Sequence, residues 1–231
     1  MDWTGDDRLP PLRLRLGEAA WLLPRISRIF GSTNPLGPLD GARALVIPGF
    51  VAHDRTTEPL RKALAGAGWR VHGWDMGVNW GARADTVERL KERIDEISAD
   101  QPLLVVGWSL GGLYARELGR AVPERVQAVV TLGSPFSGSP KQNHVWRIYE
   151  RIAGHKVDDP PLPRITDKPG VPHLALWSRR DGLIAPRAAR GLDHERDEAV
   201  ELNCTHMAFG MSNRAAQDVV REIDRFLKRH T

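Results

Sequence analysis

One serine of this chain stands in the setting of an activated nucleophile. Ser109 lies within G-W-S-L-G-G at residues 107–112, a G-x-S-x-G pattern that follows the apolar run 103–106 and precedes a helical pattern. So tight a strand–turn–helix junction requires glycine at Gly107 and Gly111, because side chains there would collide with neighbouring backbone. The junction holds the serine hydroxyl clear of the sheet, at the N-terminus of the next helix. We therefore predict that Ser109 attacks a carbonyl carbon.

Two backbone N–H groups are predicted to stabilise the oxyanion that such an attack creates. Leu110 begins the helix after Ser109, and the first N–H groups of a helix have no partner within it. Phe50 lies in the loop I-P-G-F at 47–50, where Gly49 lets the backbone come close. The simpler alternative is that proline and glycine only end a strand here.

Asp181 and His206 are the predicted partners of the serine. They follow the apolar runs 173–177 and 199–203, so parallel strands would bring both to the edge that carries Ser109. The chain order serine, acid, histidine is also the order typical of hydrolases with this serine junction. We expect His206 to accept the serine proton, and Asp181 to fix its tautomer and stabilise the imidazolium.

Other titratable residues are assigned less specific roles. Three histidines are expected at the surface or as caps: His53, His173 and His194. Three aspartates are expected to be solvated turn residues: Asp158, Asp159 and Asp167. Cys204 is the one cysteine, which excludes an internal disulfide and a thiolate metal cluster, and we expect it to be a small buried residue.

The apolar pattern predicts the frame that positions these residues. Short apolar runs alternate with longer helical patterns from residue 43 onward. The predicted strands are 44–47, 69–74, 103–106, 126–132, 173–177 and 199–203, and the predicted helices are 57–67, 84–98, 110–121 and 213–228. This alternation implies an α/β fold with a mostly parallel sheet of about six strands and helices on both faces. We expect residues 41–231 to form this domain.

Residues 136–171 form a connection longer than a crossover requires, rich in proline around a helix predicted near 143–153. We interpret this segment as a small cap over the site, since long insertions in compact domains are often lids. The alternative is an ordinary crossover helix packed on the sheet. Candidate pocket residues are Trp108, Trp146 and Tyr149.

Residues 1–40 are predicted to be helix and coil. Apolar residues recur there at three- and four-residue spacing, interrupted by a proline: Leu16, Ala19, Leu23, Ile26 and Phe30. This stripe favours docking against the domain, and the alternative is weak contact with a membrane surface through residues 1–40.

Composition limits the function classes. The chain has 231 residues, 41% hydrophobic and 27% charged, with a formal net charge of +4, which is an ordinary globular balance. Its basic residues are scattered and carry no nucleic-acid-binding pattern. No apolar stretch reaches the roughly 20 residues of a membrane span, and the first residues are acidic where an export signal is basic. We expect a cytoplasmic protein, at most peripheral to a membrane.

The motifs as a set resemble those of small bacterial esterases and lipases of the α/β-hydrolase superfamily. The matching segments are I-P-G-F at 47–50, G-W-S-L-G-G at 107–112, T-L-G-S-P-F at 131–136, S-R-R-D-G-L-I at 178–184 and C-T-H at 204–206. The resemblance implies a cofactor-free serine hydrolase that cleaves carboxylic esters of small molecules or lipids through an acyl-enzyme on Ser109. Two alternatives stay open: an acyltransferase with the same triad, and a non-catalytic protein that binds a ligand or partner.

Overall fold

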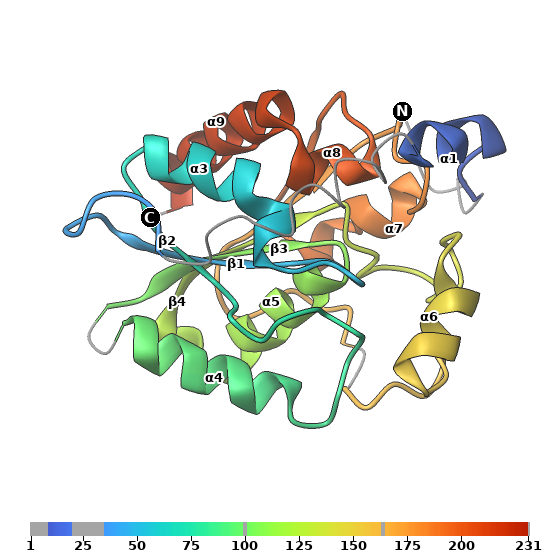
Figure 1. The fold of residues 1–231 in the computed structure, drawn as a ribbon, viewed down its shortest axis with the longest axis horizontal. Helices are drawn as coiled ribbons and strands as arrows, with labels where there is room; N and C mark the ends of the chain where they lie inside the picture. The colour runs from blue at the N-terminus through green and yellow to red at the C-terminus, as the bar shows by residue number, and fades with distance from the viewer. Residues whose placement is uncertain (1–8, 20–34, 99–100, 163–164, 231) are drawn as a thin grey trace.

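The computed structural model of the chain describes residues 9–19, 35–98, 101–162 and 165–230. Its centre is a six-stranded sheet in the order β2-β1-β3-β4-β5-β6, with every neighbouring pair parallel (Figure 1). The strands are β1 (Arg43–Ile47), β2 (Arg70–Gly73), β3 (Leu103–Trp108), β4 (Val126–Leu132), β5 (His173–Trp177) and β6 (Glu198–Glu201). Because all strands run the same way, their carboxyl ends meet at one edge of the sheet.

Helices cover both faces of the sheet. The α-helices are α1 (Leu12–Ala19), α3 (Glu58–Gly66), α4 (Thr86–Ile97), α5 (Leu110–Ala121), α6 (Trp146–Ala153), α7 (Pro186–Arg190), α8 (His206–Met211) and α9 (Asn213–His230). Short 3-10 helices are η2 (Asp54–Thr57), η3 (Pro123–Arg125) and η4 (Asp193–Glu195). The helices α3, α8 and α9 lie on one face and α4 and α5 on the other, while α6 stands apart at one end of the sheet (Figure 1).

The central strand β3 shows why the sheet needs cover on both sides. All its residues are buried, and successive side chains enter opposite layers. Val106 and Trp108 belong to the core under α3, α8 and α9, whereas Leu103 and Val105 belong to the core under α4 and α5. This alternation fixes which layer each residue near Ser109 can reach.

The predicted fold class is confirmed, and two predicted strands, 126–132 and 173–177, have the observed bounds. Other predicted bounds are wrong by a few residues, and β3 continues to Trp108 rather than ending at 106. β6 ends at Glu201 rather than 203, and α6 begins at Trp146 rather than near 143. Asn143 instead turns the chain into α6, because its side-chain oxygen accepts the N–H of Val145 at 3.0 Å.

The predicted apolar docking of the N-terminal segment is wrong at Leu16, whose exposed fraction is 76%. α1 turns a carboxylate, Glu18, toward the domain instead. Leu23, Ile26 and Phe30 lie outside the described residues. Among the residues that are described, no helix is long and apolar enough to cross a membrane.

Candidate active site

Ser109 occupies a strained turn between β3 and α5. Its backbone has φ 54° and ψ −119°, outside the regions that residues other than glycine ordinarily adopt. The turn is held by the Ser109 N–H, which donates to the Leu132 carbonyl at 2.8 Å. A β-carbon at Gly107 would collide with the Gly111 backbone, and one at Gly111 with the Ile47 carbonyl, as the sequence pattern predicted.

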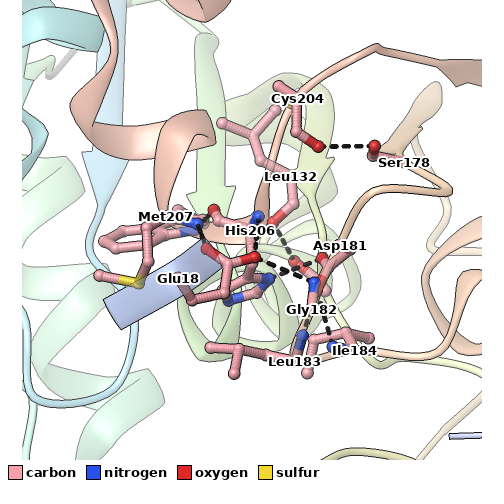
Figure 2. Close-up of polar contacts among 12 residues, drawn as sticks. Glu18, Leu132, Ser178, Asp181, Gly182, Leu183, Ile184, Cys204, His206 and Met207 are labelled. Atoms are coloured by element: carbon pink, nitrogen blue, oxygen red, sulfur yellow. Dashed lines mark hydrogen bonds and ion pairs between the residues drawn. The ribbon is translucent and has the colours of Figure 1, made fainter. Parts of the chain in front are cut away.

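Asp181 and His206 lie together at the same sheet edge. The Nδ1 of His206 and the Oδ2 of Asp181 are 2.7 Å apart, and both side chains are buried. The other carboxylate oxygen, Oδ1, accepts the N–H groups of Leu183 and Ile184, each at 2.8 Å (Figure 2). Because a carboxylate only accepts hydrogen bonds, the proton of neutral His206 is placed on Nδ1, which leaves Nε2 as the basic nitrogen.

Two carboxylates set the charge around His206. Burial lowers the pKa of His206, but the charge and hydrogen bond of Asp181, together with the charge of Glu18, raise it, and the net pKa lies above its ordinary value. The imidazole also packs beside the indole of Trp108, with ring centroids 5.9 Å apart. His206 is therefore a base made stronger by its surroundings.

The loop after β1 passes directly beside the serine. A β-carbon built on Gly49 would lie 3.1 Å from the Ser109 Cβ. Asn79 holds this loop in place. Its side-chain Nδ2 donates to the Pro48 carbonyl at 2.9 Å, and its backbone carbonyl accepts the Val51 N–H at 2.7 Å. The predicted donor residues Phe50 and Leu110 both border the space in front of Ser109.

That space is an apolar pocket with an empty volume of about 980 Å³, part of it open to solvent. Its floor is one face of α5, where Leu110, Leu113, Tyr114 and Glu117 recur at helical spacing. From Leu110 to Glu117 this face extends about 10 Å. Further lining comes from residues 135–162 and from Ile165, and includes Trp146 and Tyr149.

Two predicted assignments are wrong. Trp108 is absent from the pocket wall: its side chain is buried on the other face of the sheet, and its Nε1 donates to the His206 carbonyl at 3.1 Å. The reason is the two-residue period of β3, which places Trp108 with Val106. His173 is neither at the surface nor a cap; it is fully buried beside Thr131 and Arg116, and burial followed by the Arg116 charge holds its pKa well below the ordinary value.

Four surface assignments agree with the structure, whereas Cys204, predicted to be buried, is half-buried. Asp158, Asp159 and Asp167 are exposed, as is His194, and His53 is half-buried near the loop after β1. Burial raises the pKa of the Cys204 thiol to about 12, so this thiol is a poor nucleophile.

Sequence reasoning missed three residues that shape the site. A β-carbon at Gly133, after β4, would press on Asp181 Oδ2 and His206 Nδ1 at 3.0 and 3.1 Å, so only glycine leaves room for that pair. Asn79 braces the loop beside Ser109, and Glu18 reaches the site from α1. Only Gly133 carried a sequence signal, since it lies within the T-L-G-S-P-F segment at 131–136.

The chain matches the alpha/beta hydrolase fold family over residues 45–187, which is more than half of its length. The protein belongs to that family. Among curated relatives, the pimeloyl-[acyl-carrier protein] methyl ester esterase of Salmonella heidelberg is 38% identical over 78 residues, 32% of this chain. The aligned region spans 30% of that relative's length.

Solved structures share the fold across most of the chain. The monoacylglycerol lipase of Paleococcus ferrophilus has a TM-score of 0.62 at 17% identity, over 86% of this chain and 98% of the lipase. The carboxylesterase CesB of Bacillus subtilis has a TM-score of 0.60 at 14% identity, over 94% of this chain and 97% of the esterase. At these identities the likeness concerns the fold.

Proposed function

We propose that this α/β-hydrolase cleaves carboxylic esters through an acyl-enzyme on Ser109. The observation that carries the proposal is the position of this serine. It is strained at φ 54° and lines an apolar pocket, which leaves room for a substrate carbonyl in front of it. A serine is held in such a conformation at a cost, and strain of this kind clusters at functional sites. The Asp181–His206 pair at the same sheet edge supplies the base that the serine requires.

The proposed reaction has two steps, acylation of Ser109 and hydrolysis of the acyl-enzyme. Ser109 Oγ bonds to the ester carbonyl carbon as His206 Nε2 takes its proton, and the N–H groups of Leu110 and Phe50 stabilise the oxyanion. Collapse of this intermediate breaks the bond to the alcohol, which leaves with the proton from His206. Water then attacks the acyl-enzyme, again giving its proton to His206, and the acid departs as Ser109 recovers the proton.

The pocket supports esters with an apolar acyl or alcohol group of medium length. Its lining is mainly hydrocarbon, which favours burial of an alkyl chain, and the α5 floor extends about 10 Å from Leu110 to Glu117. The similar proteins, a methyl ester esterase, a monoacylglycerol lipase and a carboxylesterase, support ester chemistry in general.

Hydrolysis of a p-nitrophenyl ester series from acetate to palmitate tests this proposal. We expect kcat/KM to rise from acetate to a maximum at medium chains and to fall at palmitate, because burial of each methylene contributes about 0.8 kcal/mol until the pocket is full. Acyl transfer to an added alcohol in preference to water would identify an acyltransferase instead. Absence of turnover, together with absence of labelling by a fluorophosphonate, would favour a non-catalytic binding protein.

Residues 136–171 are proposed to act as the cap that selects the substrate. No residue of α6 is buried, which argues against a crossover helix packed on the sheet. The segment instead meets the loop next to Ser109: the Tyr149 ring packs on Phe50 with centroids 5.0 Å apart, and the Tyr149 hydroxyl accepts the Ala82 N–H at 3.1 Å.

Trp146→Ala is expected to shift the ratio of rates toward longer and bulkier acyl esters at nearly constant melting temperature. Trp146 lines the pocket but is only half-buried, so its truncation widens the pocket without leaving a core cavity. Ile148→Ala is the matched control, since Ile148 lies on the same helix and is 54% exposed. A lower melting temperature with an unchanged ester preference would argue against the cap.

A further inference from the structure

The helix α1 meets the domain through a buried carboxylate. Among residues 12–18, Glu18 is the one buried residue, with an exposed fraction of 5%, whereas Leu12 and Leu16 are 68% and 76% exposed. This reverses the ordinary preference, because glutamate is almost never fully buried unless its oxygens are satisfied. The partners of this carboxylate therefore identify what α1 does.

Within the described part of the chain, Glu18 accepts three backbone hydrogen bonds, and all three donors lie on the two loops that carry Asp181 and His206. Glu18 Oε1 accepts the N–H of Gly182 at 2.9 Å and the N–H of His206 at 2.7 Å. Oε2 accepts the N–H of Met207 at 2.9 Å (Figure 2). His206 and Met207 begin α8, so the carboxylate satisfies N–H groups that the helix itself leaves open, and its charge suits that end of the helix.

The backbone of α1 also seats closely on the acid loop. A β-carbon at Gly182 would collide with the carbonyl of Leu14, so the residue after Asp181 must be glycine for α1 to pass. Just before α1, the Pro10 carbonyl lies 2.7 Å from Nε2 of His144, in the segment proposed as the cap. The N-terminal segment thus contacts both the cap and the acid–base loops.

We infer that Glu18 is a positioning residue that holds the Asp181 loop and the start of α8 in register, so that α1 completes the active site. This inference rests on the proposed function. One carboxylate joins Gly182 to His206, and movement of either loop would lengthen the contact between Asp181 and His206. Since a displacement of about 1 Å far from the reacting atoms can cost on the order of 100-fold in rate, such a brace matters for turnover.

The charge of Glu18 adds an effect that a purely mechanical tether lacks. The charged groups that face His206 are Asp181, from the loop after β5, and Glu18, from α1, and both raise its pKa. Removal of the Glu18 charge should lower that pKa. Because neutral His206 is the base, the rising limb of kcat/KM with pH, expected above about pH 6.5 in the native protein, should then move to lower pH.

Glu18→Gln tests the inference in the full chain. The amide oxygen can keep the bonds from Gly182 and His206, while the NH₂ group faces the Met207 N–H, donor against donor, and the charge is lost. We expect kcat to fall about 10- to 100-fold with KM largely unchanged. The rising limb should move to lower pH, so the variant is least impaired in acid. Leu16→Gln, an equally polar change on the exposed side of α1, should behave as the native protein.

Titration of the His206 imidazole by NMR separates this inference from the proposed function. The chain has eight histidines, and His206→Gln assigns the signal. If the native protein hydrolyses no ester, the proposed function fails. A lower His206 pKa in Glu18→Gln would still support the interaction of Glu18 with the start of α8 at His206. A native pH profile and native kcat in Glu18→Gln would overturn the inference, as would a loss of rate that only follows a lower melting temperature. Glu18→Asp keeps the charge but has a shorter side chain. It should lower kcat, and it should shift the rising limb of kcat/KM with pH less than Glu18→Gln does.

Discussion

Ser109→Ala is expected to abolish ester hydrolysis while the protein stays folded. Removal of the nucleophile of a serine triad lowers turnover by on the order of 10⁶, because base, acid and serine act as a unit. Alanine keeps the β-carbon, so the backbone strain at φ 54° and the packing of Gly49 against that carbon both persist. We therefore expect a nearly unchanged melting temperature alongside the lost activity.

The measurement pairs steady-state hydrolysis with labelling by a fluorophosphonate. The native chain should incorporate one probe, and Ser109→Ala none. Ser139→Ala is the control, because Ser139 is exposed and lies outside the pocket wall. Activity of more than a few per cent in a clean preparation of Ser109→Ala would mean that another residue is the nucleophile.

The nucleophile junction could be predicted from sequence because its constraints are local. Gly107 and Gly111 are required by atoms that the turn itself brings close, and the buried run of β3 follows the pattern of a parallel strand. The burial of Trp108 under His206 was also within reach, since the period of two places it with Val106. The prediction was wrong because it relied on the position of Trp108 next to Ser109 in the chain. That position does not determine which face of the sheet the Trp108 side chain occupies.

The role of Glu18 could not be predicted in this way. Its bonds join residues 164, 188 and 189 positions apart, and nothing local distinguishes it from a solvated glutamate at the end of a short helix. The amphipathic pattern suggested that Leu16 would dock, but a helix seated at the open N-terminus of α8 gains more from a carboxylate that satisfies N–H groups. Apolar periodicity predicts which hydrocarbon side chains are buried. It does not predict a carboxylate that is buried because it accepts backbone N–H groups.

Asp181→Asn is expected to lower kcat by about 10⁴ without loss of structure. The asparagine oxygen can keep the two bonds from the Leu183 and Ile184 N–H groups, which fix the side chain. Its NH₂ group then occupies the place of Oδ2 and donates to Nδ1 of His206. The imidazole must carry its proton on Nε2 instead, so the nitrogen proposed to take the serine proton can no longer accept it.

The pH dependence separates this tautomer effect from a simple loss of charge. Loss of the Asp181 carboxylate also lowers the pKa of His206, so the rising limb of kcat/KM should move to lower pH, as in Glu18→Gln, but from a far lower plateau. Asp158→Asn is the matched control, because Asp158 is exposed and pairs with Lys141 at the surface. If Asp158→Asn or Asp167→Asn were the more damaging change, the acid would lie in the segment 136–171 rather than after β5. A plateau near the native value in Asp181→Asn would mean that His206 keeps its tautomer without this carboxylate, and the role assigned to Asp181 would be wrong.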